Sequence, residues 1–177
     1  MSVPAQIIQF GPGEGPVVSA VGDVYRMLAT GVQTGGAYVL SEARVPPGGG
    51  PPPHIHHRED EAFFVLEGEI TFQLGGKKLV GRAGTFIQGP RGVPHAFKNE
   101  SPAPARMLIL VTPPGFEKFM VEIGHPLPAF DSPPLPVTPA DIQRLLAVAP
   151  KYGIEILPPR IDVVRGTTAA IVAADLE

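Results

Sequence analysis

Glycine and proline divide this chain into short segments that suit β-strands. The 177 residues include 21 Gly and 23 Pro, yet 44% are hydrophobic, which is typical of a globular chain and not of a disordered one. Eight runs with strand character lie between turn signals, at 23–30, 36–45, 61–68, 69–76, 78–82, 85–89, 95–99 and 105–112. From Ile70 to Leu74, apolar and polar residues alternate, as in a half-buried strand. Many short strands at regular spacing predict an all-β sandwich or barrel.

A change of pattern after residue 112 predicts two helices. In the first helix the apolar residues recur at the spacing of one helix face, at Phe116, Phe119, Met120 and Ile123. Gly124 stands where a glycine commonly follows a helix. The second helix is expected to have Thr138 as its N-cap and Pro139 at its first position, and to end just before Pro150. Its apolar face is predicted to be Ile142, Leu145, Leu146 and Ala149.

The length and the lack of an internal repeat predict one domain over residues 1–177. Its expected parts are a barrel at about 20–112, a helical extension at about 113–153 and a tail at 154–177. The proline-rich segment 125–137 fits neither helix nor strand and is expected to wrap the barrel. Residues 161–177 could add one strand, but the sequence does not place it.

Charge and hydropathy exclude several classes of function. The net charge is −3, without a basic cluster for nucleic acid or a polybasic membrane anchor. No apolar run is long enough for a membrane span, and the first residues lack the pattern of a secretion signal, so we expect a cytoplasmic protein. The absence of cysteine excludes disulfides and thiolate chemistry.

The segment GGGPPPHIHHREDEAFFVLEG (residues 48–68) carries the strongest chemical signal. Proline stiffens the backbone. The three prolines are followed at once by His54 and His56, whose side chains share one face of an extended segment. Glu61 has the wrong parity to continue that face, so we expect a turn or bulge within residues 57–60.

A further ligand is available in GTFIQGPRGVPHAFKNE, where Gly92 and Pro94 form a turn that places His95 at the start of a strand. Three neutral imidazoles and one carboxylate suit a first-row divalent ion with one or two positions left for water or substrate. We therefore predict one divalent transition metal ion (Ni, Fe, Mn, Co, Cu or Zn) and no further cofactor. An open metal site of this kind favours catalysis.

At these residues the chain resembles the cupin superfamily. The first cupin motif, G-x5-H-x-H-x4-E-x6-G, is read from Gly48, His54, His56, Glu61 and Gly68. The second, G-x5-P-x-G-x2-H-x3-N, is read from Gly84, Pro90, Gly92, His95 and Asn99. The resemblance implies a double-stranded β-helix, or jelly roll, with two C-terminal helices added here. It also implies that the metal ligands are His54, His56, Glu61 and His95.

The segments after the barrel narrow the resemblance. TPPGFEKFMVEIGHP and KYGIEILPP are similar to the C-terminal extension of single-barrel, quercetin 2,3-dioxygenase-like cupins. This likeness implies a dioxygenase that uses dioxygen and an aromatic or enol-bearing small molecule. Glu61 would be both a metal ligand and the general base. The residues expected at the substrate pocket, some of which could instead be core, are Phe63, Phe72, Phe97, Phe116 and Met120.

Two other functions remain open. A metal-dependent isomerase or lyase acting on a sugar or keto acid would need several polar or cationic groups around the metal. A non-catalytic small-molecule-binding cupin would be expected to have lost a ligand, and none is lost. The inward faces are rich in apolar residues, which favours the dioxygenase.

The remaining polar residues near the motifs are not expected to bind the metal. His57 points away from the His54 face, and His125 lies in the proline-rich segment, so both are predicted to be solvated. Glu59 and Asp60 could compete with Glu61, but the motif spacing favours Glu61. Arg91 is expected to be an exposed turn residue.

The predicted oligomer is a homodimer. Its basis is the apolar strand at 105–112 and the segment VPAQIIQF at 3–10, which has no evident place in a minimal barrel and could cover a neighbouring sheet edge.

Overall fold

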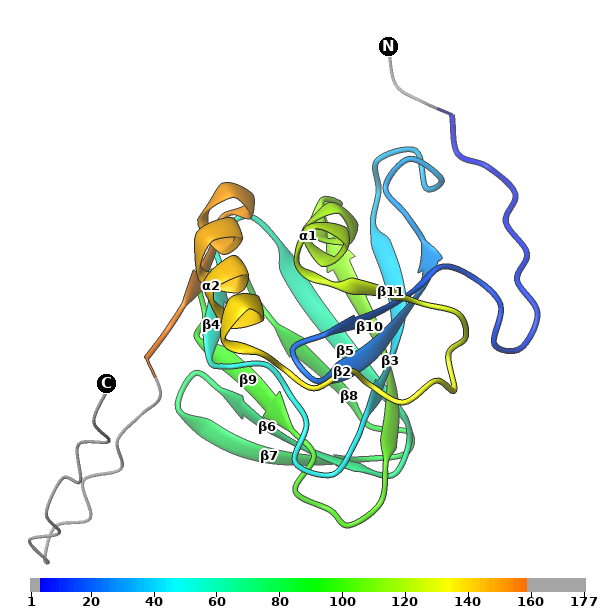
Figure 1. Ribbon diagram of the computed structural model, residues 1–177. Coiled ribbons are helices and arrows are strands. Elements are labelled where there is room, and N and C mark those ends of the chain that lie inside the picture. The colour runs from blue at the N-terminus through cyan, green and yellow to red at the C-terminus, as the bar shows by residue number, and fades with distance from the viewer. Residues whose placement is uncertain (1–3, 159–177) are drawn as a thin grey trace, which may run out of the picture.

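The computed structural model describes residues 4–158 and consists of two antiparallel sheets with two helices packed against them (Figure 1). The larger sheet has the order β11-β1-β2-β3-β10-β5-β8. Its strands are β1 (Val17–Ala20), β2 (Asp23–Ala29), β3 (Val39–Val45), β5 (Asp60–Glu67), β8 (Phe86–Gly89), β10 (Ala105–Thr112) and β11 (His125–Leu127). The predicted all-β class is confirmed.

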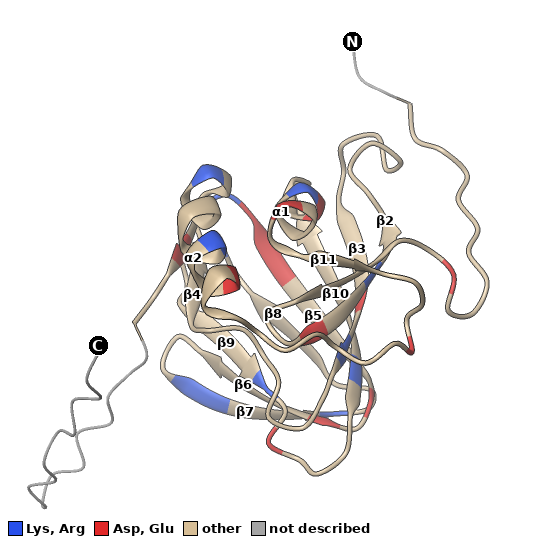
Figure 2. Ribbon diagram, in the orientation of Figure 1, with Lys and Arg blue, Asp and Glu red and all other residues tan. Residues whose placement is uncertain are grey.

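The smaller sheet has the order β12-β4-β9-β6-β7. Its strands are β4 (His54–His56), β6 (Glu69–Leu74), β7 (Lys77–Arg82), β9 (His95–Lys98) and β12 (Ile154–Ile156). The helices are α1 (Phe116–Ile123) and α2 (Pro139–Val148), and a 3₁₀ turn, Ala149–Tyr152, follows α2. Acidic and basic residues are interspersed along the ribbon in Figure 2. Among the described residues, no helix is both long and apolar enough to cross a membrane.

The core lies between the two sheets because alternate residues of each strand point inward. In β10, Met107, Ile109 and Val111 are buried, whereas the residues between them are partly exposed. Strand β10 pairs with β3 on one side and β5 on the other, so its inward residues lie at the centre of the larger sheet.

Asn99, the last residue of the second cupin motif, anchors the turn that follows β9. Its side-chain amide donates to the carbonyl oxygens of Val45, at 2.9 Å, and Ala103, at 2.7 Å. Its Oδ1 accepts from the backbone N–H and the hydroxyl of Ser101, at 2.9 and 2.7 Å. Since Asn99 is fully buried, these bonds fix the loop between β9 and β10 against the end of β3.

Helix α1 closes one end of the barrel, and its predicted apolar face is buried in the core. Gly124 follows it as expected, but in an extended conformation (φ −91°) and not in the left-handed one of a helix-ending glycine. The need for glycine here is steric, because a Cβ would lie 2.6 Å from the Met120 carbonyl oxygen.

Helix α2 begins as predicted. Thr138 and Asp141 form a capping box, and Pro139 occupies the first helical position. Of the predicted apolar face, Leu145 and Ala149 are buried, whereas Ile142 and Leu146 are about half exposed. Only the part of the face nearest the barrel therefore packs on it.

Four strands lie outside the eight predicted runs. β4 coincides with the segment at His54 and His56 that is expected to be extended, whereas β1 is not predicted. The strand β11 lies in the proline-rich segment predicted to be irregular, and β12 lies at the start of the predicted tail. β11 forms because it pairs with β1, and β12 because it pairs with β4. The possible strand within residues 161–177 lies outside the described residues.

Candidate metal centre

Two neighbouring strands of the smaller sheet carry three imidazoles. Strands β4 and β9 pair with His54 opposite His95, and His56 lies on the same face of β4. The ring centroids are 4.4 Å apart for His54 and His95, 5.1 Å for His54 and His56, and 5.6 Å for His56 and His95. All three residues are buried. Strand pairing thus gathers histidines that lie far apart in the sequence.

Glu61 reaches the same point from the other sheet. It lies on β5, and its Oε2 is 2.9 Å from His95 Nε2 and 3.5 Å from His56 Nε2. The break expected within residues 57–60 is a crossing from the smaller sheet to the larger one, and not a bulge within one strand. One ligand atom from each of the four residues lies within 4.8 Å of every other.

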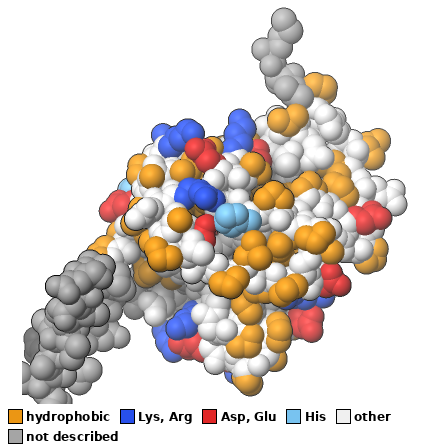
Figure 3. Space-filling view, in the orientation of Figure 1, with side chains coloured by type: hydrophobic (Ala, Val, Ile, Leu, Met, Phe, Trp, Pro, Cys, Tyr) orange, Lys and Arg blue, Asp and Glu red, His pale blue; other side chains and the backbone are white. Residues whose placement is uncertain are grey.

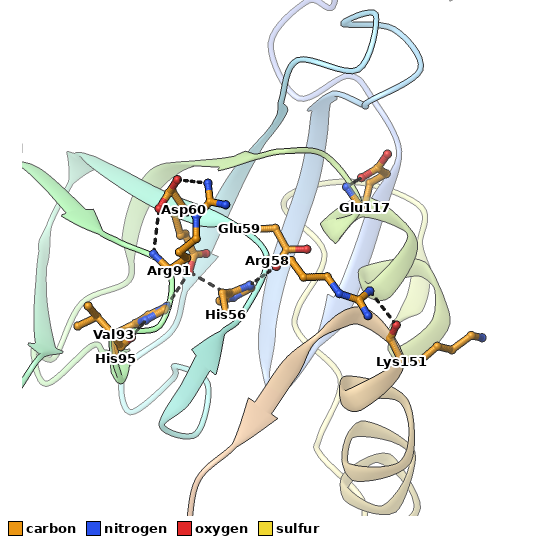
Figure 4. A network of polar contacts seen from close by, with 11 residues as sticks. His56, Arg58, Glu59, Asp60, Arg91, Val93, His95, Glu117 and Lys151 are labelled. Atoms are coloured by element: carbon orange, nitrogen blue, oxygen red, sulfur yellow. Dashed lines mark hydrogen bonds and ion pairs between the residues drawn. The ribbon is translucent and has the colours of Figure 1, made fainter. Parts of the chain in front are cut away.

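The outer nitrogen of each imidazole is held by an acceptor. For His54 and His95, Nδ1 lies 2.9 Å from the carbonyl oxygen two residues earlier. For His56, Nδ1 lies 3.3 Å from Oε2 of the buried Glu59 (Figure 4). A proton on Nδ1 leaves Nε2 free to coordinate, and histidine ligands in metal sites are held in this way.

Polar atoms of the cluster that lack a hydrogen-bond partner indicate whether a metal ion would fit among the four residues. His56 Nε2 is buried and has no hydrogen-bond partner among the described residues. Leaving such an atom unpaired costs free energy, and a cation would supply its partner. At His95, the proton shared between Nε2 and Glu61 would be released when a cation binds. Three imidazoles and one carboxylate therefore fit a divalent transition metal ion.

The protonation states of His54 and Glu61 also suit coordination, whereas, against the effect of burial, the hydrogen bond to Glu61 raises the pKa of His95, so that His95 must lose a proton to bind a metal. Burial lowers the pKa of His54 to about 3, and the nearby His95 adds to the effect. Burial by itself would raise the pKa of Glu61, but the hydrogen bond from His95 and the charges of the imidazoles lower it to about 2. At neutral pH His54 is thus neutral and Glu61 ionised, which are the states that bind a metal.

An apolar cavity of about 40 Å³ opens beside the cluster. Apart from the ligands His54, His56 and Glu61, it is lined by Val21, Tyr25, Pro51, Pro52, Phe116, Phe119, Met120, Ile123, Leu145, Ile154 and Ile156. A wider apolar groove of about 480 Å³ adjoins it along α2 and β12. Apolar side chains cover much of the face seen in Figure 3.

The phenylalanines expected at the pocket fall into two groups. Phe116 lines the cavity, as does Met120. Phe63, Phe72 and Phe97 do not, because they pack on one another in the core, with ring centroids 5.1 to 6.3 Å apart. Tyr25 and Leu145 also line the cavity, and no sequence signal marks them because each lies on an element distant from both motifs.

Residues 41–111 match the family model described as "Cupin domain". These residues form a cupin domain. A curated relative is quercetin 2,3-dioxygenase of Bacillus subtilis, 25% identical over 114 residues, which are 64% of this chain and 34% of that enzyme. An uncharacterized protein of Methanocaldococcus jannaschii is 29% identical over 100 residues, 56% of this chain and 80% of that protein. The matched part of the cupin thus spans about a third of the curated enzyme's length.

Solved structures share the cupin fold. A predicted oxalate decarboxylase from Thermotoga maritima has a TM-score of 0.54 and 20% identity, with 59% of this chain and 97% of that one covered. An RmlC-like cupin from Shewanella frigidimarina has a TM-score of 0.53 and 21% identity, with 65% and 96% covered. At these identities the likeness concerns the fold alone.

Three other polar side chains that the sequence brought into question pair away from the cluster. His57 is exposed and lies 2.8 Å from Glu155. His125 is partly exposed and lies 2.8 Å from Asp141. Arg91 is exposed and pairs with Asp60 at 2.6 Å (Figure 4).

Proposed function

We propose that this cupin is a metal-dependent dioxygenase acting on an aromatic or enol-bearing small molecule. The observation that carries the proposal is the buried cluster of three imidazoles and one carboxylate at an apolar cavity. The likeness to the Bacillus subtilis enzyme over 64% of this chain supports the same reaction class.

In this proposal the four cluster residues bind the metal, Glu61 has a second role as the base, and Glu59 positions a ligand. His54, His56, Glu61 and His95 would hold the ion, which when bound would supply a Lewis acid for an oxygen of the substrate. Glu61 is ionised, and its carboxylate would be the acceptor for the proton that the substrate hydroxyl gives up. Glu59 holds the His56 ring through Nδ1 and so keeps its Nε2 directed at the cluster.

The cavity lining favours an apolar substrate over a sugar or a keto acid. Among the described residues, no Lys or Arg side chain lines the cavity, and its walls consist mainly of Phe, Met, Ile and Leu. A sugar or phosphate would leave several polar groups without partners there. An aromatic ring would instead bury apolar surface against Phe116 and Met120, with the adjoining groove as the route of entry.

Measuring bound metal and oxygen uptake on the same samples tests the proposal. The protein, loaded in turn with Ni, Fe, Mn, Co and Cu, is assayed aerobically with flavonols and small enols. Glu61→Gln keeps the size of the side chain and one oxygen ligand, so it should retain part of the metal while turnover falls by about 10²- to 10⁴-fold. Glu69→Gln, in an exposed ion pair with Arg82, is the matched control and should leave both unchanged.

Two results would count against the proposal. Absence of oxygen uptake with every metal and substrate would remove the dioxygenase assignment. Near-native turnover in a fully loaded Glu61→Gln protein would remove the base role and leave Glu61 as a ligand only.

We also propose that a second copy of the chain binds the outer face of β3, β10, β5 and β8. Apolar side chains gather there, at Leu40, Phe64, Phe86, Leu108 and Leu110, and both phenylalanines are at least 40% exposed. Such a patch commonly marks an interface. Sedimentation should show a dimer at micromolar concentration and a monomer for Phe86→Glu. A monomeric wild type would contradict this.

A further inference from the structure

One residue with a hydroxyl group, Tyr25, lines the cavity beside the metal cluster. Among the described residues that line the cavity, Tyr25 is the only one with a polar side chain apart from the ligands. It lies on β2, points into the barrel and is 3% exposed. A hydroxyl in an otherwise apolar wall determines which ligands can bind without losing a hydrogen bond.

The carboxyl group of Asp23 positions the Tyr25 hydroxyl through a hydrogen bond. The Tyr25 hydroxyl donates to Oδ2 of Asp23 at 3.3 Å. Asp23 is fully buried, and within residues 4–158 its Oδ1 has no partner that meets hydrogen-bond geometry and its carboxyl group has no cationic partner. The nearby backbone N–H of Gly50 opposes the rise in the pKa of this carboxyl group without cancelling it. The loop of the first cupin motif encloses it, because a Cβ on Gly49 would collide with Oδ1. A buried acid without a counter-charge is costly, which indicates a role beyond packing.

The pair can present a proton to the cavity. Burial raises the pKa of Asp23 to about 7, so its carboxyl group can carry a proton near neutral pH. When it does, the carboxyl group can donate to the Tyr25 oxygen, and the Tyr25 proton is free to turn to the cavity. Burial, followed by the charges of Asp23 and Glu61, raises the pKa of Tyr25 well above its usual value, so the hydroxyl stays a donor.

We propose that the Tyr25 hydroxyl, positioned by Asp23, hydrogen-bonds a second oxygen atom of the substrate while the first oxygen binds at the metal cluster. The substrate class is therefore a small organic molecule with two oxygen substituents, such as an ortho-dihydroxy aromatic compound or an enolised hydroxy ketone. This inference rests on the proposed function only in that a substrate oxygen binds at the cluster.

Binding of catechol and phenol to the Zn²⁺-loaded protein tests the inference. The two probes differ by one hydroxyl group, and zinc allows binding to be measured by calorimetry without turnover. Tyr25→Phe should weaken catechol binding about threefold to tenfold, the net value of one hydrogen bond, and change phenol binding less than twofold. Any contact of the second catechol hydroxyl with zinc is present in the wild type and in Tyr25→Phe alike, so it cancels when the two proteins are compared.

Two further variants complete the design. Asp23→Asn should weaken catechol binding in the same selective way, because the hydroxyl loses its positioning partner. Tyr38→Phe removes a partly exposed hydroxyl remote from the cavity and should change neither affinity. Equal loss for catechol and phenol in Tyr25→Phe, or no catechol binding by the wild type, would overturn the inference. If Tyr25→Phe loses catechol binding selectively but the wild-type protein takes up no oxygen, only the dioxygenase proposal is refuted.

Discussion

Replacing Asp23 by Asn should change how the stability of this protein depends on pH. Burial raises the pKa of the Asp23 carboxyl group from 3.8 to about 7 in the folded state. The folded chain therefore keeps a proton that the unfolded chain releases near pH 4. The stability that this proton contributes is complete below about pH 4 and is lost as the pH rises through about 7.

The size of the effect follows from the two pKa values. Moving one pKa from 3.8 to about 7 corresponds to about 4 kcal/mol of unfolding free energy. Since Asn has no proton to lose, its free energy of unfolding relative to wild type should increase between pH 4 and pH 8 by about this amount. Urea denaturation of the metal-free proteins at several pH values measures the difference.

Asp131→Asn, at an exposed position, is the matched control and should follow wild type at every pH. If the Asp23→Asn and wild-type curves run parallel from pH 4 to pH 8, Asp23 is ionised in the fold throughout. Tyr25 could not then receive a proton from it, and the orientation argued for the hydroxyl would be wrong.

Three further outcomes are expected. His54→Ala should bind less metal by elemental analysis, and its thermal midpoint should rise less on metal addition than that of wild type; an equal rise in both would exclude His54 as a ligand. Asn99→Ala removes four hydrogen bonds from a buried turn and should lower the unfolding free energy in urea by about 2 to 4 kcal/mol, whereas a loss below 1 kcal/mol would show that the turn is held by other contacts. Thr138→Ala should cost about 1 kcal/mol and Thr138→Ser much less, and equal losses would mean that the cap does not depend on the hydroxyl.

Strands with one buried face could be predicted from the sequence, because their side chains alternate. β1 has no such alternation, since all four of its residues are buried. β11 contains Pro126 and β12 has three residues, so neither carries a local strand signal. Both depend on a partner strand distant in the sequence, which periodicity does not reveal.

The four residues of the candidate metal centre could be found from motif spacing, because the motifs place the histidines on two paired strands and Glu61 just after the chain crosses to the other sheet. The residues that line the cavity could not be predicted in this way. Phe72 and Phe116 are equally apolar in sequence, but one packs between the sheets and the other reaches the cavity from α1. Asp23 and Tyr25 lie well upstream of both motifs, and only the closure of the barrel brings them beside the cluster.

The placement of the cluster across two sheets has a consequence for the order of folding events. His54, His56 and Glu61 lie within eight residues of one another, yet the first two belong to the smaller sheet and Glu61 to the larger one. The four donors converge only after β9 has paired with β4 and the two sheets have closed on the core. A metal ion added during refolding should therefore bind late and slow unfolding, because it joins two sheets that separate when the protein unfolds.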